Sequence, residues 1–405
     1  MAWESGGYSV TEDICPLTLV KEGKAVIQVC DLSAYADEKG YVDPAWVPVF
    51  YNPRMACSRD ISSAVVGAFA EVCGRSLVVA DVLCATGVRG IRYALENEGV
   101  ATVFLNDIDP KCFNLTLRNI RLNGLEGRAF AFNYDAVKFL LEHRRIDVID
   151  VDPFGSPARF VDPAIRAIVH GGMLCVTATD TAALMGKYPG ACLRKYSSLC
   201  YSAEFSREIA VRVLLQFLAR EAAKLGAAVK PLISYYMDHH VRVCVQVLRK
   251  RPDYEQLTSK LGYLVYNPKT LHRQLVKLDE LGHQKLGEDY VVSGPLWAGE
   301  FADGGFVERV LKIFLERAEL GYCKRGAKLL VYLKEEVSKA PLYYTTDSLV
   351  SSYGLRAEVS VEKLVRVLSE RGFSSSRTHF DGKGFRTSAP LDVILETFRE
   401  LSSAR

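Results

Sequence analysis

The sequence has 405 residues, of which 49% are hydrophobic and 24% are charged, as in ordinary globular proteins with a large core. That length predicts two domains. The formal net charge is only +3, which excludes nucleic-acid binding through overall charge and confines any such surface to a local patch.

The amino terminus, residues 1–7, lacks the charged start and apolar segment of a secretion signal. No uninterrupted apolar run approaches the length needed to cross a membrane. We therefore expect a cytoplasmic protein without membrane contacts, and we expect it to be a monomer.

Apolar, β-branched segments alternate with segments of helical periodicity in the first half of the chain. Strands are predicted at 77–83, 102–107, 128–133, 146–151 and 173–178, with helices such as 110–122 and 135–143 between them. This alternation predicts a Rossmann-like α/β domain with a mostly parallel, doubly wound sheet. Two further strands, 232–237 and 241–248, are expected to form an antiparallel edge on that sheet.

Charge and proline interrupt this pattern at 249–252, which predicts a boundary between a domain 1–250 and a domain 251–405. The second domain has mixed strand and loop signals, followed by helix-like runs at 305–320 and 324–339. Its end is predicted to contain two helices, 346–352 and 361–371, and a hairpin of strands 374–380 and 385–388. We therefore expect a smaller α+β domain with a winged-helix-like end.

Basic residues concentrate at this hairpin and at one earlier helix. The hairpin region contains Arg371, Arg377, His379, Lys383 and Arg386 against Asp381 alone, and Arg194 and Lys195 are adjacent in the first domain. Such groups fit either a solvated surface or phosphate contacts. We predict phosphate contacts for Arg194, Lys195, Arg377, Lys383 and Arg386.

The eleven cysteines form no Cys-x-x-Cys pair and are scattered from Cys15 to Cys323. In a chain of this length without a secretion signal, we expect them to serve as small buried hydrophobic residues, although the sequence leaves open whether any of them pair. The only histidine pair, His239-His240, lies in a predicted strand, where neighbouring side chains point to opposite faces. We predict no metal site.

Polar residues follow the first three predicted strands. The segment from Asp81 to Gly90 joins the first strand to its helix, and its glycines allow the backbone to approach a cofactor. Asp107 ends the second strand, where a carboxylate can accept hydrogen bonds from ribose hydroxyls; the role of helix cap fits Asp109 better. Asp135 follows the third strand, where an adenine amino group would lie. The Gly-x-Gly-x-x-Gly fingerprint is absent, which disfavours a nicotinamide dehydrogenase.

The segment Asp152-Pro153-Phe154-Gly155-Ser156-Pro157 follows the predicted strand 146–151. A carboxylate followed by proline and an aromatic at a strand end suits methylation of an amine on a flat ring, because the acid accepts the N–H while the aromatic covers the ring. The alternative is an ordinary turn, since all these residues are common turn formers.

Together with these motifs, several further segments make the chain resemble the tRNA (guanine(26)-N(2))-dimethyltransferases. The resemblance covers most of the chain and includes Val49–Ala56, Ser58–Asp60, Ala85–Gly90, Leu105–Asp107, Asp152–Pro157, Val176–Asp180, Ala191–Tyr196, Thr378–Phe380 and Lys383–Pro390. It implies a class I methyltransferase domain that uses S-adenosyl-L-methionine and acts on tRNA. The chain is similar to the compact archaeal form, without the Cys-x-x-Cys pairs of some relatives.

The resemblance also implies roles for individual residues. Asp152 would be catalytic and engage the guanine amine, with Phe50 and Phe154 on either side of the base. The S-adenosyl-L-methionine site would be lined by Arg59, Arg89, Asp107, Asp135 and Ala136. From the residues alone, Arg89 could equally cap its helix or pair with Asp60.

Two other functions remain open on the motifs alone. Asp-Pro-aromatic motifs also serve methyltransferases that act on another guanosine, or on adenine, in RNA or DNA. A non-catalytic RNA-binding protein could retain the fold and the wing, although carboxylates at three strand ends disfavour that reading.

Overall fold

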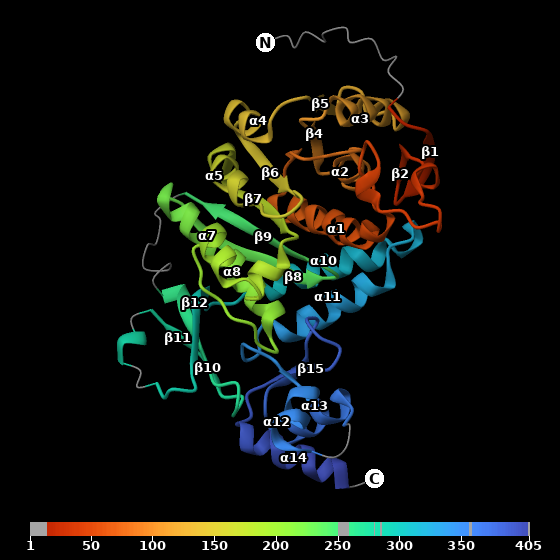
Figure 1. Cartoon of the computed structure of the whole chain (residues 1–405). Helices are drawn as coiled ribbons and strands as arrows, with labels where there is room; N and C mark the ends of the chain where they lie inside the picture. The colour runs from red at the N-terminus through yellow and green to blue at the C-terminus, as the bar shows by residue number, and fades with distance from the viewer. Residues whose placement is uncertain (1–13, 250–258, 279, 284–285, 356–358, 404–405) are drawn as a thin grey trace.

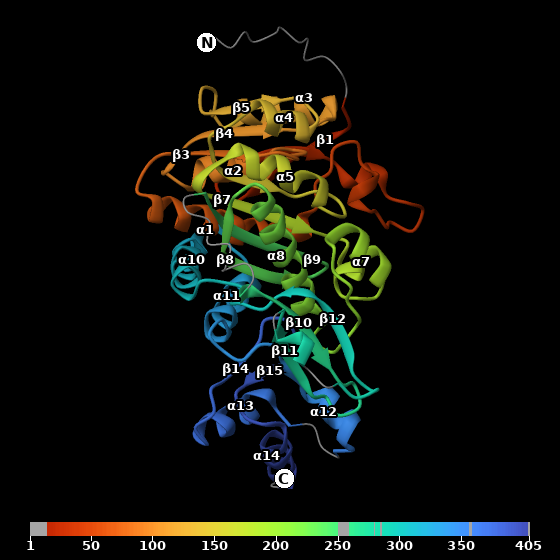
Figure 2. The ribbon, with the colours of Figure 1, turned by 90° about the vertical axis from the view of Figure 1, so that its left-hand side faces the viewer.

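The computed structural model describes residues 14–249, 259–278, 280–283, 286–355 and 359–403 (Figure 1). The predicted domain boundary at 250–251 lies outside these residues. Figures 1 and 2 show an elongated molecule, with a large sheet near the amino-terminal end and the carboxy-terminal helices at the opposite end.

A seven-stranded sheet with the order β5-β4-β3-β6-β7-β9-β8 forms the centre of the first domain. Strands β3 to β7 are parallel to one another, whereas β9 is antiparallel to both β7 and β8. The doubly wound sheet and its antiparallel edge are therefore confirmed. The strands are β3 (Leu77–Asp81), β4 (Val100–Asn106), β5 (Ala129–Phe132), β6 (Ile146–Val151), β7 (Ile168–Ala178), β8 (Ala228–Met237) and β9 (His240–Leu248).

Helices cover both faces of this sheet. One group comprises α1 (Ala56–Cys73), α2 (Val88–Glu96) and α3 (Pro110–Leu122); the other comprises α4 (Ala136–Glu142), α5 (Ala158–Ala167) and α8 (Ser206–Lys224). Two short helices, α6 (Thr181–Leu184) and α7 (Pro189–Tyr196), follow β7. All six residues of β6 are buried, as expected for a strand covered on both faces.

An amino-terminal hairpin of β1 (Leu17–Glu22) and β2 (Ala25–Cys30) packs against α3. The side chains of Asn119 and Asn123 each accept from and donate to the backbone of β2. Three short 3₁₀ helices, η1 (Leu32–Tyr35), η2 (Pro44–Trp46) and η3 (Pro53–Met55), lead from the hairpin to α1.

The second half begins with a small antiparallel sheet of β10 (Leu261–Tyr266), β11 (Arg273–Lys277) and β12 (Val291–Trp297), with the short η4 (Leu281–His283) between β11 and β12. The predicted helices follow as α10 (Gly304–Glu316) and α11 (Lys324–Glu336), separated by η5 (Ala318–Leu320). Both pack against α1, beside which they lie in Figure 1. The two halves therefore share a large contact surface.

The winged-helix-like end is present. It consists of α12 (Thr346–Tyr353), α13 (Val361–Glu370) and a three-stranded sheet of order β13-β15-β14, formed by β13 (Tyr344–Thr345), β14 (Ser375–Arg377) and β15 (Gly384–Thr387). A last helix, α14 (Leu391–Ser403), was not predicted and packs against α13. Among the described residues, no helix is long and apolar enough to span a membrane.

Six cysteines are not simple apolar side chains, which corrects the prediction made for all eleven. Disulfides join Cys15 to Cys30, Cys57 to Cys323 and Cys175 to Cys244. Sequence spacing gave no sign of them because each pair meets only through the fold. The other five, four of them buried, are free: Cys73, Cys84, Cys112, Cys192 and Cys200.

Candidate active site

The carboxyl ends of β3, β4, β5 and β6 meet at one edge of the sheet, so the polar residues that follow these strands lie close together. Between β3 and α2, Gly87 has φ +77°, and a Cβ there would lie 3.1 Å from Thr116. The tight turn therefore requires glycine. Such a loop lets backbone groups approach a ligand at this edge.

Asp107 connects this loop to the end of β4. Its carboxylate accepts hydrogen bonds from the backbone N–H of Ala85 (2.9 Å) and of Asp109 (3.0 Å). Burial raises the pKa of Asp107. Asp109, not Asp107, caps α3 by accepting from the N–H of Lys111, as predicted. A carboxylate has about four acceptor positions, and these two hydrogen bonds of 3.0 Å or less use two of them.

Asp135 and Ala136 stand at the start of α4. Asp135 caps this helix through the N–H of Val137 (2.9 Å), and its other oxygen pairs with exposed Arg159 at 2.7 Å. Ala136 is buried. Asp135 therefore has a structural partner in addition to its predicted role toward an adenine amino group.

Arg89, on α2, directly contacts the carboxylate of Asp152. Its Nη1 also donates to Ser62 Oγ at 2.8 Å. Burial lowers the pKa of Arg89, but the neighbouring carboxylates of Asp152 and Asp150 outweigh burial and raise it well above its usual value. Arg89 thus remains charged and holds the Asp152 carboxylate in place. It does not pair with Asp60, which binds Arg92 instead (2.8 Å).

Phe50 and Phe154 meet at this end of β6, with ring centroids 4.8 Å apart and planes at 86°. The two rings contact each other in this structure, so no flat base fits between them, and their predicted places on either side of the base stay a prediction. Phe154 is 72% exposed and precedes Gly155, which has φ +80°. Placing a guanine between the rings therefore requires Phe154 to turn aside.

Behind Asp152, a buried charged cluster supports Arg89 that sequence reasoning missed. Asp150 pairs with Arg242 at 2.6 Å and accepts from the Tyr93 hydroxyl at 2.5 Å. Arg89 Nη1 lies 4.0 Å from the same carboxylate. The available signal was the presence of Asp147 and Asp150 within the otherwise apolar β6, because a buried acid needs a partner.

Asp81, at the end of β3, makes the stability of the protein depend on pH through its burial and its proximity to the charge of Asp150. Burial and the Asp150 charge raise its pKa from 3.8 to about 7. The folded state therefore holds a proton that the unfolded state releases, and stability declines as pH rises from 3.8 to about 7. We expect Asp81→Asn to match the wild type near pH 4 and to be more stable at pH 8, by up to about 4 kcal/mol. Urea unfolding across this range measures the difference; a constant difference would contradict the pKa shift.

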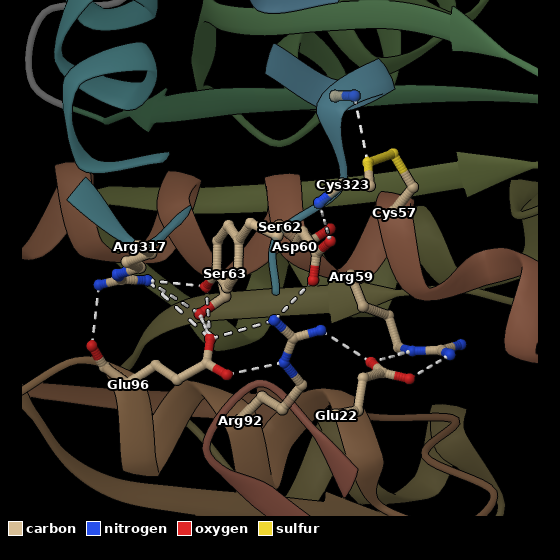
Figure 3. Close-up of polar contacts among 12 residues, drawn as sticks. Glu22, Cys57, Arg59, Asp60, Ser62, Ser63, Arg92, Glu96, Arg317 and Cys323 are labelled. Atoms are coloured by element: carbon tan, nitrogen blue, oxygen red, sulfur yellow. Dashed lines mark hydrogen bonds and ion pairs between the residues drawn. A yellow bond between two sulfur atoms is a disulfide. The ribbon is translucent and has the colours of Figure 1, made fainter. Parts of the chain in front are cut away.

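Arg59 is held by a second buried network, shown in Figure 3. Its Nε and Nη2 donate to the two oxygens of Glu22 at 2.7 and 2.6 Å, and Glu22 also pairs with Arg92 at 2.7 Å. Burial raises the pKa of Glu22, but both arginines outweigh burial and lower it to about 2. Arg92 further binds Asp60 and Glu96 at 2.8 Å each. The amino-terminal hairpin thus positions Arg59.

Four of the five predicted phosphate-binding residues lie at or near the surface. Arg194 is exposed on α7, and its neighbour Lys195 pairs with Asp180 at 2.8 Å. On the wing, Lys383 is exposed and pairs with Asp347 at 2.8 Å, while the half-buried Arg377 contacts Glu362 and donates to the Gly382 carbonyl at 2.7 Å. Their phosphate contacts stay a prediction.

The prediction that Arg386 contacts phosphate is wrong. Its side chain is fully buried and pairs with Glu208 at 2.8 Å and with Glu336 at 2.6 Å. It cannot reach a phosphate from this position. The reason is that β15 is the central strand of its sheet and all four of its residues are buried, whereas an exposed hairpin had been assumed.

The chain was compared with known proteins. Residues 23–399 match the family model described as N2,N2-dimethylguanosine tRNA methyltransferase. The chain belongs to this family. It is 38% identical to the tRNA (guanine(26)-N(2))-dimethyltransferase of Aeropyrum pernix, over 96% of this chain and 98% of that protein. It is 36% identical to the enzyme of that name from Methanocaldococcus jannaschii, over 96% of this chain and 100% of that protein.

A solved structure shows the same architecture. It is the complex of Trm1 from Pyrococcus horikoshii with S-adenosyl-L-methionine, with a TM-score of 0.81, 34% sequence identity, and coverage of 94% of this chain and 99% of that one. The fold of this N2,N2-dimethylguanosine tRNA methyltransferase family member is therefore that of a class I methyltransferase followed by a smaller carboxy-terminal part. Within the described residues, no three His, Cys, Asp or Glu side chains are grouped to hold a metal ion.

Proposed function

We propose that this protein transfers methyl groups from S-adenosyl-L-methionine to the N2 amine of guanosine 26 in tRNA, giving mono- and then dimethylguanosine. One observation carries the proposal: in a member of this family, the Asp152 carboxylate stands at the carboxyl end of β6, held by buried Arg89 beside the Phe50–Phe154 pair. We further propose that the protein acts as a cytoplasmic monomer without a metal ion, with residues 1–250 forming the catalytic domain and 251–405 the tRNA-binding domain.

The strand-end residues fit S-adenosyl-L-methionine. Asp107 retains acceptor capacity for ribose hydroxyls, and Asp135 offers a carboxylate for the adenine amine above the small, buried Ala136. Arg59 and Arg89 supply positive charge for the carboxylate of the amino-acid moiety. When bound, S-adenosyl-L-methionine supplies an electrophilic methyl group on a sulfonium.

Asp152 would then act on the amine. The N2 lone pair of guanine is delocalised into the ring, so the amine is a poor nucleophile. A carboxylate that accepts its N–H shifts electron density toward nitrogen and receives the proton that leaves when the N–C bond forms. Arg89 keeps this carboxylate oriented. Phe50 and Phe154 would cover a guanine that has left its stack.

The experiment is methylation of two tRNA transcripts that differ only at position 26, one with guanosine and one with adenosine. We expect nucleoside mass spectrometry to find N2-methylguanosine and N2,N2-dimethylguanosine in the first transcript and no methylated nucleoside in the second. Methylation of both transcripts, or a methylated adenosine, would instead support a methyltransferase that acts on another base. Absence of any transfer would contradict the proposal.

A further inference from the structure

A cleft of about 350 Å³ lies where the catalytic domain meets the winged end. Its walls come from the end of β8, the exposed side of α11, the loop after β14 and the start of α8. We name it the junction cleft; the lysine, arginine and aspartate residues of its lining are Arg207, Asp238, Arg325, Lys328, Arg377 and Asp381. Of the five residues predicted to bind phosphate, Arg377 alone is in its lining.

The junction cleft lies along the same sheet edge as Asp152. The first residues of β9 pair with the last residues of β7 (Val241 with Ala178), so the β8–β9 turn is at the carboxyl edge. His240, the first residue of β9, has its Nε2 3.2 Å from Ser58 Oγ on α1. Ser58 lies one helical turn before Ser62, which binds Arg89. A continuous path of contacts therefore leads from Asp152 to the cleft.

The wall from α11 carries a row of cationic and aromatic side chains. Arg325, Lys328 and Tyr332 are spaced three and four residues apart, which places them on one face of the helix. Lys328 Nζ lies 5.6 Å and Arg377 Cζ 5.0 Å from the Tyr332 ring centroid. Lys328 is exposed and makes no ion pair with any described residue. This row leads from the catalytic edge toward the wing.

Acidic groups only partly balance these cations. Arg325 forms two hydrogen bonds of 2.7 Å with Asp238, and Arg207 pairs with Asp381 at 2.9 Å. Both pairs are open to solvent, with 56% and 42% exposure of the arginine side chains, so each contributes little stability. An arginine has five N–H donors and can bind a phosphate without releasing its carboxylate. The lining has four cations and two carboxylates, and Glu362, outside the lining, pairs with Arg377, so Lys328 is the lining cation without an acidic partner among the described residues.

We propose that the junction cleft binds the sugar–phosphate backbone of the tRNA substrate, at nucleotides away from the one that is methylated. This inference rests on the proposed function. RNA is favoured over a small anion because the four cations come from three separate elements, α8, α11 and β14, and line an open cleft. Arg325 and Lys328 would contact phosphates, and contacts of this kind position a nucleic acid without reading its bases.

The test uses Lys328→Gln, the double variant Arg325→Gln/Lys328→Gln, and the matched control Lys334→Gln. Lys334 is a cation on the same helix but outside the cleft lining, and it pairs with Glu308 at 2.6 Å. All three positions are exposed, so folding should be unaffected. Tritiated-methyl kinetics and filter binding of tRNA at several salt concentrations give KM, kcat, Kd and the salt slope; calorimetry gives S-adenosyl-L-methionine affinity.

We expect the double variant to raise Kd and KM for tRNA roughly tenfold and to reduce the salt slope by about 1 per cation removed. The single variant should show about half of each change on a logarithmic scale, and the control none. kcat at saturating tRNA and S-adenosyl-L-methionine affinity should stay unchanged.

A double variant with the wild-type Kd and salt slope would overturn the proposal that the junction cleft binds tRNA. An equal loss of tRNA affinity in the Lys334→Gln control would overturn it as well. Another outcome would assign the cleft to a protein partner. In that case the wild type and the double variant bind tRNA with the same affinity, but an acidic protein competes with tRNA only in the wild type. If the wild type binds tRNA but leaves guanosine 26 unmethylated, the proposed function fails. The comparison of tRNA affinities between wild type and variants then still tests whether the junction cleft binds tRNA. A wild type that binds no tRNA overturns both.

Discussion

Replacing Asp152 by asparagine should lower the rate of methyl transfer by about 10²- to 10⁴-fold, the range for loss of a general acid–base group. Asparagine has the same shape, so the Phe50–Phe154 pair should persist, and its amide oxygen can still accept a hydrogen bond. It cannot, however, take the proton that leaves the guanine amine, and it removes the charge opposite Arg89.

Single-turnover methylation of tRNA measures this effect, because it separates the chemical step from product release. Asp162→Asn, a carboxylate on α5 paired with Arg166 at the surface, should keep the wild-type rate. S-adenosyl-L-methionine should still bind the Asp152 variant, because its proposed contacts with Arg59, Asp107 and Asp135 do not involve Asp152. A wild-type rate in the Asp152 variant would remove the proposed mechanism.

The largest effect on stability is expected at Arg386. Replacing it by methionine would leave the buried carboxylates of Glu208 and Glu336 without their shared cation. Arg212 would still contact Glu208, and His379 would still contact Glu336. Removing one partner of a buried ion pair destabilises proteins by about 3–5 kcal/mol. We therefore expect the variant to unfold at a lower urea concentration and its backbone amides in the winged end to exchange hydrogen faster.

The dependence of this effect on pH follows from Glu208. Burial raises its pKa, but Arg386 and Arg212 outweigh burial and lower it from 4.5 to about 2. The pair thus contributes stability above pH 4.5 and loses it as pH falls toward 2. The difference between variant and wild type should be greatest near neutral pH and smaller at acidic pH. Adding Glu336→Gln should partly restore the variant, because it removes one uncompensated charge.

This result would also separate two roles for Arg386. A phosphate-binding residue would change the salt dependence of tRNA affinity while leaving unfolding intact. A buried residue that pairs with Glu208 and Glu336 would change unfolding while leaving the salt dependence of tRNA affinity intact. Wild-type unfolding with an altered salt slope would contradict the role that its burial indicates.

The parallel sheet and the loops that carry the site could be predicted from the sequence. Alternating apolar and helical segments specify a parallel sheet, and such a sheet brings the carboxyl ends of its strands to one edge. Asp107 and Asp152 directly follow their strands and Asp135 lies in the short loop after β5, so their convergence needed no knowledge of distant contacts. The separate roles of Asp107 and the cap Asp109 were also decided locally, by the position of Pro110.

Only the tertiary structure decided which side chains are buried and which partners they take. Arg386 and Lys383 look equivalent in the sequence, but β15 is a central strand packed in the interior whereas Lys383 lies in the exposed turn before it. Likewise, Arg92 rather than Arg89 binds Asp60: the two side chains share a face of α2 but lie about one turn apart along the helix, so they meet different neighbours. The disulfide from Cys57 to Cys323 joins segments 266 residues apart. The local pattern of apolar residues specifies whether a segment forms a helix or a strand. Packing between segments distant in the sequence decides which of its faces is buried.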